Sequence, residues 1–276
     1  MKKQPKTTLF LRLMACIFAK SFTTIFLFVI GIDATAQNKE ISLKPFLGIG
    51  FYKTQDQVIS PLIYQGTSTL VGMEKIKQTD RKLTNLRLFY GGGKLKNDFK
   101  NTAKHYTGQI YYALMKPINK HFYVGAASQT LIAVRDYSVA KSFGLESLSG
   151  DIFSTLNLAL AHQTEEKKKW GKIQTKVEFA VAGVAIARKM YTIVSNPDLI
   201  VLETKPWKTV LKSAEIISIS QLKKVDFSLN YTKNIGKKQA IGLDIGMGIY
   251  RYERLNATVI SQNTTILAGY LFHFKR

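Results

Sequence analysis

The sequence contains a single cysteine, Cys16, among its 276 residues, so no disulfide framework can stabilise it. Beyond residue 32 it also lacks any apolar run of the ~18 residues that a membrane-spanning helix needs, which excludes a helical membrane protein there. Acidic residues are few, because 18 Asp and Glu stand against 40 Lys and Arg and give a net charge of +22. The hydrophobic fraction of 46% excludes a disordered basic tail.

The first 36 residues have the features of an export signal. Basic residues are scattered through residues 1–20, and the apolar core Ser21–Ile32 that follows is too short to span a bilayer. Ala34-Thr35-Ala36 provides small residues at −3 and −1, which predicts cleavage before Gln37. A lipoprotein processed at Cys16 is the alternative, although it would leave the apolar core on the mature chain. We therefore predict a signal peptide at 1–36 and one domain, without cysteine, at 37–276.

The mature chain alternates between apolar and polar residues with a period of two. In Ala240–Tyr252, large apolar residues occupy one face and small or charged residues the other. The apolar face holds Ile241, Leu243, Ile245, Met247 and Ile249; the second face holds Gly242, Asp244, Gly246, Gly248 and Tyr250. A soluble sandwich strand would place Lys, Glu or Thr opposite its apolar face, whereas glycines and an acid suit a narrow lumen. Val225–Lys233 and Ile152–Gln163 repeat the pattern over about the ten residues that a tilted transmembrane strand needs.

These patterns predict an all-β fold, a closed antiparallel up-and-down transmembrane β-barrel of about ten strands. Eight or twelve strands are the alternatives, because the second and third segments alternate imperfectly. The predicted strands are 41–53, 66–76, 82–93, 104–116, 120–136, 151–163, 173–190, 214–233, 239–252 and 262–274. The links between them alternate in length, as in transmembrane barrels with short periplasmic turns and long outer loops. The predicted short turns are 116–120, 165–172 and 234–238, and the longer links are 54–66, 94–103, 137–150, 192–213 and 253–261.

Aromatic residues near the predicted strand ends suggest two girdles at the membrane interfaces. Amphipathic rings settle at the depth of the headgroups, so a barrel carries one girdle at each interface. The girdle near the long loops would contain Tyr52, Tyr90, Tyr106, Tyr137, Tyr191 and Tyr252. The girdle near the short turns would contain Phe122, Trp170, Tyr231, Phe272 and Phe274.

The last predicted strand, Thr264–Phe274, carries Ile266, Ala268, Tyr270 and two phenylalanines on one face. It resembles the C-terminal strand of bacterial outer-membrane β-barrels, although Lys275 and Arg276 follow the final aromatic. With the start at Gln37 and the compact hairpins, the chain is similar to the small outer-membrane barrels of the Bacteroidetes type. This resemblance implies a location in the outer membrane of a Gram-negative cell, and recognition of the last strand by the barrel assembly machinery. It implies no substrate.

Catalytic and metal-binding motifs are absent from the sequence. None of the four histidines, His105, His121, His162 and His273, has a serine two residues away on the same face of its strand. No His-x-x-x-His or cysteine cluster offers a zinc site, and Gly91–Lys96 lacks the spacing of a nucleotide-binding loop. We therefore expect no catalysis, no metal and no cofactor. An enzyme acting on lipid or lipopolysaccharide through other residues is the alternative.

Six polar residues on the strands are candidates for the barrel lumen. Facing hydrocarbon, an arginine or lysine near the midplane would cost about 2–4 kcal/mol, whereas facing inward it can pair with an acid. The candidates are Arg87, Lys176, Glu178, Asp226, Asn230 and Asp244. They fit either a salt-bridge plug or a charged constriction that selects solutes. Small barrels usually have interiors filled with side chains, which favours the plug.

The basic excess lies mostly at predicted turns and loops, and no nucleic-acid-binding motif accompanies it. We expect these residues to face the headgroups of outer-membrane lipids and lipopolysaccharide. The link 192–213 is the best candidate for a loop that binds an envelope partner. The sequence thus predicts a barrel without catalysis, acting as a narrow pore or as a loop-presenting envelope or scaffold protein. A soluble periplasmic barrel with an apolar ligand inside is a further alternative, and it requires the apolar face to point inward.

Overall fold

The computed structural model describes residues 40–57, 60–137, 147–165, 170–190, 215–254 and 257–275. The predicted signal peptide at 1–36 and the predicted partner-binding loop at 192–213 lie outside these ranges. The chain divides into two units, Met1–Asn38 and Lys39–Arg276, and the fold described below is that of the second. Within the described ranges, no helix has the length and apolar character needed to cross a membrane.

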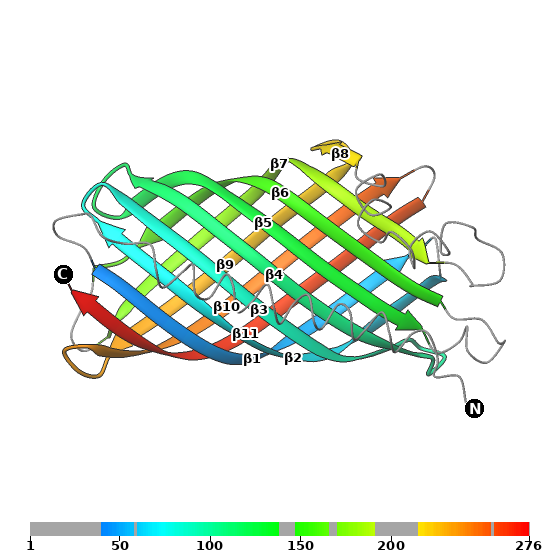
Figure 1. Ribbon diagram of the computed structural model, residues 1–276, viewed down its shortest axis with the longest axis horizontal. Coiled ribbons are helices and arrows are strands. Elements are labelled where there is room, and N and C mark those ends of the chain that lie inside the picture. The colour runs from blue at the N-terminus through cyan, green and yellow to red at the C-terminus, as the bar shows by residue number, and fades with distance from the viewer. Residues whose placement is uncertain are drawn as a thin grey trace, which may run out of the picture. The chain divides into compact units, whose positions relative to one another are not determined.

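Antiparallel strands pair in chain order and close on themselves, because the first strand pairs with the last (Figure 1). The strands are β1 (Glu40–Asp56), β2 (Ser60–Thr79), β3 (Lys82–Lys96), β4 (Thr102–Pro117), β5 (Phe122–Tyr137), β6 (Ser147–Gln163), β7 (Lys172–Met190), β8 (Glu215–Ser218), β9 (Leu222–Asn234), β10 (Gln239–Arg254) and β11 (Ala257–Lys275). The short β8 and the longer β9 pair with successive parts of β7. They therefore occupy one strand position in the barrel wall, and the eleven strands fill ten positions. The structure is therefore a closed ten-stranded antiparallel barrel, as the sequence predicted.

The apolar face of β10 lies on the outside of the barrel. Leu243 and Ile249 are 41% and 54% exposed, whereas Asp244 between them is 2% exposed. The other strands follow the same rule, since their exposed large apolar residues include Leu47, Ile49, Val71, Leu156, Leu158, Leu160, Val225 and Ile266. The orientation predicted for Ala240–Tyr252 is confirmed. A soluble barrel built around an apolar ligand would need these side chains inside.

The strand β7 contains an extra residue that reverses which positions face inward. Asn157 of β6 pairs with Ala180 and Leu156 pairs with Ala182, so Val181 has no partner in the ladder between β6 and β7. Before the bulge in the chain, even-numbered residues such as Glu178 are buried. After it, the buried residue is the odd-numbered Ala185. Such a bulge shifts the side-chain alternation by one.

The bulge in β7 coincides with a break in the strand predicted at 214–233. The ladder between β7 and β9 ends at Phe179 and Val225, and the one between β7 and β8 begins at Ala182 and Ser218. A turn at 219–221 separates β8 from β9. The prediction of one continuous strand is therefore wrong at this turn, because alternation alone cannot reveal where extra residues are looped out.

Strands extend into three of the predicted long links, 54–66, 94–103 and 253–261. β1 ends at Asp56 and β2 begins at Ser60, β3 reaches Lys96, and β10 reaches Arg254. A ladder needs only backbone hydrogen bonds, so the pairing continues where the regular alternation of apolar and polar residues stops. The predicted boundaries were wrong here because consecutive apolar residues, as at Leu62-Ile63-Tyr64 and Val259-Ile260, interrupt the alternation within the strands.

Glycine is required at one hairpin end. Gly171, which precedes β7, has a φ of 72°, and a Cβ there would lie 2.4 Å from the carbonyl oxygen of Thr232. We expect Gly171→Ala to lower the free energy of unfolding by about 1–2 kcal/mol, because L-residues pay that much in the left-handed region. The matched control is Gly236→Ala in the turn before β10, where the added Cβ would lie 4.0 Å from the side chain of Gln239. Urea unfolding of the refolded protein measures both, and equal losses would contradict the argument.

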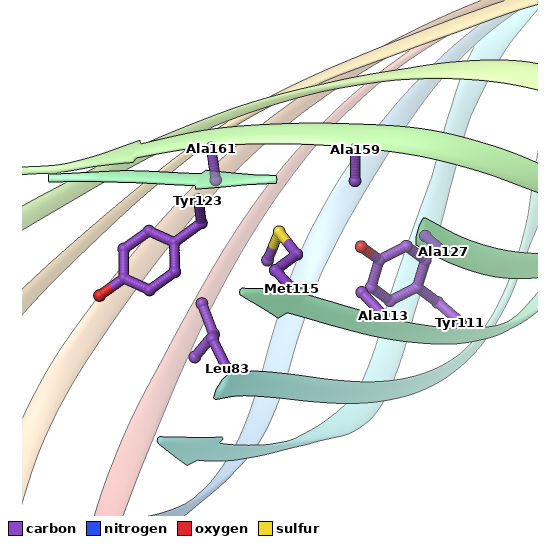
Figure 2. Packing of buried hydrophobic residues seen from close by; sticks show 8 residues of the cluster. All are labelled: Leu83, Tyr111, Ala113, Met115, Tyr123, Ala127, Ala159 and Ala161. Atoms are coloured by element: carbon purple, nitrogen blue, oxygen red, sulfur yellow. The ribbon is translucent and has the colours of Figure 1, made fainter. Parts of the chain in front are cut away.

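Clusters of buried apolar side chains lie toward both ends of the interior. Near the short turns, Leu83, Met115 and Tyr123 form one cluster with Tyr111 and four alanines, and Figure 2 shows Met115 lying between the two tyrosine rings in that view. Two further clusters lie toward the long loops. They contain Tyr52, Tyr64, Leu95, Ala103 and Tyr137, and Phe153, Ala185, Ile217, Leu222, Tyr250, Tyr252 and Val259.

The position of these rings corrects part of the predicted girdles. Tyr52, Tyr137 and Tyr252 are at most 7% exposed and pack inside the barrel, not at a membrane interface. Tyr90 is 40% exposed and Trp170 is 70% exposed, as a girdle requires. Tyr191 lies outside the described residues. The girdles were predicted from position along the strand alone; Tyr252 lies two residues from Tyr250, so the alternation of this strand already indicated that it faces inward.

Candidate functional site

Four charged side chains form a closed ring of ion pairs inside the barrel. Lys44 Nζ lies 2.8 Å from Glu74 Oε2 and 2.7 Å from Asp244 Oδ2. Arg87 Nη2 lies 2.8 Å from Glu74 Oε1 and 2.9 Å from Asp244 Oδ2. Each cation therefore bridges both acids, and each acid contacts both cations. The side chains of Lys44, Glu74 and Asp244 are at most 4% exposed, and that of Arg87 is 16% exposed.

The ring crosses the interior. Arg87 stands on β3 and Asp244 on β10, and β2, β1 and β11 separate these strands along the wall. A hydrogen bond between the two side chains must therefore run through the lumen. Asn85, also on β3, donates to Glu74 Oε1 at 2.8 Å and adds a neutral partner. The side chains of the ring therefore occupy part of the cross-section of the lumen.

A second polar network lies on β4, β6 and β7. Lys176 Nζ lies 2.7 Å from Glu178 Oε1, and the Tyr111 hydroxyl donates to the same oxygen at 2.6 Å. The ammonium of Lys176 also lies 4.1 Å from the centre of the Tyr111 ring, a cation–π distance. Asn157 donates to Glu178 Oε2 at 3.2 Å. Glu178 is thus held by a lysine, a phenol and an amide at once.

Two further ion pairs complete the interior. Lys224 of β9 contacts Asp226 of the same strand and the side-chain oxygen of Gln129. Nearer the long loops, Arg135 Nη1 lies 2.6 Å from Asp151 Oδ2, and Arg135 Nη2 donates to the Tyr250 hydroxyl at 3.2 Å. Arg135 has a 1% exposed side chain, so it is wholly removed from water.

The charges in these groups cancel. The basic members are Lys44, Arg87, Arg135, Lys176 and Lys224, and the acidic members are Glu74, Asp151, Glu178, Asp226 and Asp244. Burying an ion without a partner costs several kcal/mol, which explains why each is paired. The interior networks are therefore neutral, and the net charge of +22 resides elsewhere in the chain.

A cavity of about 90 Å³, lined by both polar and apolar side chains, lies between the networks. Its lining includes Arg87, Lys176, Glu178, Lys224 and Asp226, together with Gly246 and Gly248. The glycines keep the space open, because a Cβ at Gly248 would lie 2.6 Å from Asp226 Oδ1. The space is large enough, and has enough polar partners, to hold ordered water.

The structure brings the predicted lumen residues together in part. Arg87 and Asp244 meet in the ring, and Lys176 and Glu178 meet in the second network. Asp226 pairs with Lys224, which the sequence analysis had not selected. Asn230 is the ladder partner of Asp244, and its side-chain oxygen has no hydrogen-bond partner among the described residues.

Four other interior charges were missed as well, namely Lys44, Glu74, Arg135 and Asp151. Glu74 could have been found, because a two-residue turn at Asp80 and Arg81 places it directly opposite Arg87. Lys44 lies on the polar face of β1, between Ser42 and Phe46, which are both buried. Arg135 and Asp151 stand near strand ends, where the apolar alternation that guided the selection is weak.

Two serine–histidine contacts join different strands, β1 with β11 and, across β3, β2 with β4. Ser42 Oγ lies 2.8 Å from His273 Nδ1, and Glu40 Oε1 lies 3.3 Å from the same nitrogen. A Ser-His-acid relay needs serine and acid on opposite ring nitrogens, and here both approach Nδ1. Ser68 Oγ lies 3.1 Å from Nδ1 of the buried His105. The described residues contain no group of three or more His, Cys, Asp or Glu that could hold a metal ion.

Comparison with known proteins relates the chain to outer-membrane barrels by fold alone. No family model matches it, and no curated protein matches it. The outer-membrane protease OmpT from Escherichia coli matches with a TM-score of 0.52 and 7% identity, over 88% of this chain and 99% of that one. The translocator domain of the autotransporter NalP from Neisseria meningitidis matches with a TM-score of 0.45 and 8% identity, over 95% and 97% of the two chains. The fold thus resembles outer-membrane β-barrels.

Proposed function

We propose that this protein is an integral outer-membrane β-barrel without catalysis, whose interior is closed by paired side chains and whose wall carries loops for an envelope partner. The observation that carries the proposal is the division between an exposed apolar wall and the ion-paired interior. Exposed Leu and Ile on every side suit acyl chains, and the buried charges suit a lumen shielded from them.

A plug fits the interior better than a selective pore does. A constriction that selects ions presents one sign of charge to the permeating solute. Here each cation of the ring is matched by two acids at 2.7–2.9 Å, and apolar clusters lie toward both ends of the interior. A narrow pore remains the second candidate, and the cavity of about 90 Å³ is the observation that favours it.

The location and partners follow from the same proposal. The signal peptide at 1–36 would direct export, and the short turns would face the periplasm. The last strand, Thr264–Phe274, would engage the barrel assembly machinery, and its apolar Phe272 and Phe274 are 40% and 54% exposed. Outer-membrane lipids would surround the wall, and the partner protein would bind the outer loops. Relation to the Bacteroidetes-type barrels belongs to this proposal too.

Conductance measurements test the plug. The protein is refolded in detergent, its folded state is checked by a heat-modifiable gel shift, and it is inserted into planar lipid bilayers. We expect no stepwise conductance, because the ring and the end clusters leave no continuous aqueous path. Discrete steps would instead support the pore.

Catalysis is tested with the same refolded material. We expect no hydrolysis of a labelled phospholipid or of a labelled peptide above the rate of the heat-denatured sample. Turnover that disappears on heating would contradict the proposal of a barrel without catalysis.

A further inference from the structure

Four lysines form a basic patch on the outer surface of β1, β3 and β4. Lys94 and Lys104 are direct partners across the ladder between β3 and β4. Gln65 of β2 pairs with Lys53 on one side and with Lys96 on the other. All four lysines are exposed and lie near the strand ends that lead to the long loops. We call Lys53, Lys94, Lys96 and Lys104 the outer lysine patch.

The outer lysine patch borders an apolar surface. Phe51 and Val71 are 47% and 56% exposed, and Tyr90, the ladder partner of Val71, is 40% exposed. Thr67 pairs with Phe51 on one side and with Lys94 on the other, so the change from apolar to basic takes place within one ladder row. The basic surface suits the charged headgroup of an amphiphile, and the adjoining apolar surface suits its acyl chains.

The patch lacks compensating charge from the protein. Like charges directly opposite each other in a ladder are destabilising, and Lys94 faces Lys104. None of the four forms an ion pair with any residue of the described ranges, in contrast to Arg251, which lies 2.9 Å from Glu253 on the same outer face. Asp136, which is buried, is the only acid that lies opposite a member of the patch in the ladders of the described strands, where it is the partner of Lys104. The interior networks are neutral, so they do not compensate the positive charge of the outer lysine patch.

We propose that the outer lysine patch binds the phosphate of an anionic lipid, whose acyl chains lie along Phe51, Val71 and Tyr90. Lys94, Lys96 and Lys104 surround the phosphate, and the hydroxyl of Thr67 and the amide of Gln65 supply neutral hydrogen bonds. Charge complementarity and the adjoining apolar surface together select a phosphorylated lipid over a free anion. The proposal rests on the membrane location proposed above and adds a specific lipid site to it.

Binding of phosphorylated lipid A by the refolded full-length protein tests the site. A fluorescent derivative in mixed detergent micelles is titrated with protein, and anisotropy gives the affinity. We expect Lys94→Gln/Lys96→Gln/Lys104→Gln to weaken binding on the order of 100-fold, from the loss of three lysines near a lipid surface. The matched control is Lys82→Gln/Lys116→Gln/Lys120→Gln, which removes the same charge from exposed lysines at the other end of the barrel. We expect this control to bind within about threefold of the unchanged protein.

Two further arms separate the phosphate source. Dephosphorylated lipid should bind as weakly as the triple variant, and millimolar inorganic phosphate should not displace the labelled lipid. Equal loss in the two triple variants, equal binding of the dephosphorylated lipid, or displacement by inorganic phosphate would each overturn the site. The heat-modifiable shift is measured on the unchanged protein and on both variants. Its absence from the unchanged protein would count against the proposed function, whereas the binding of variants that retain the shift reports the site.

Discussion

Asp244→Asn is expected to lower the free energy of unfolding by about 3–5 kcal/mol, because removing one member of a buried ion-pair network leaves uncompensated charge. Asp244 accepts from Lys44 at 2.7 Å through both of its oxygens and from Arg87 at 2.9 Å. Asparagine keeps the shape but offers one acceptor oxygen and no charge. Lys44 and Arg87 would then share Glu74 alone, with two positive charges held against one.

The same substitution on the neighbouring strand provides the control. Asp226 contacts Lys224 alone among the ion pairs and has a 25% exposed side chain, against 3% for Asp244. The Lys224 side chain that Asp226→Asn leaves behind is 5% exposed, but it keeps its contact with the side-chain oxygen of Gln129. We therefore expect a smaller loss than at Asp244, about 1–3 kcal/mol. Urea unfolding in detergent or vesicles, followed by the heat-modifiable gel shift, compares the two. Equal losses would mean that the ring adds nothing beyond an ordinary interior pair.

Strand positions and orientation could be predicted from the sequence because both depend on local alternation. Each of the ten predicted segments overlaps a strand, and the outward face of β10 was identified residue by residue. The alternation of outward apolar and inward polar residues is a strong signal. If Asp244 faced outward, its charge would lie in the same apolar surroundings as Leu243 and Ile245. From Lys94 to Lys96 the outward residues are lysines, so the alternation predicted that the strand ends at residue 93, whereas β3 ends at Lys96.

Contacts between strands that are distant along the wall could not be predicted in this way. The pairing of Glu74 with Arg87 follows from a two-residue turn, which fixes the register of one hairpin. The contact of Arg87 with Asp244 depends instead on the number of strands, on their stagger and on the way β1 meets β11. The bulge at Val181 has the same character, because one extra residue in β7 changes which neighbours face each other without altering the composition of the segment.

Ile245→Arg is expected to cost about 2–4 kcal/mol of folding free energy in a bilayer, because its side chain lies at the centre of the outward apolar series of β10. The partners of Ile245 on β11 and β9 are Ile266 and Leu229, so no acid lies opposite it to pair with the guanidinium. In water the same substitution on an exposed wall would change stability by only ~0.5 kcal/mol. The size of the loss therefore reports the medium that surrounds the barrel.

A second position on β10 shows how the cost of an arginine depends on its depth in the bilayer. Ile249 is also outward and 54% exposed, but it lies two residues from Arg251, a native arginine paired with Glu253 at 2.9 Å. We expect Ile249→Arg to cost only about 0–1 kcal/mol, because the penalty for arginine falls toward the interface. Urea titrations of folding into phospholipid vesicles measure both variants against the unchanged chain. Equal and small costs at positions 245 and 249 would place the outer face of β10 in water, since only a hydrocarbon layer of limited thickness penalises the first arginine and spares the second.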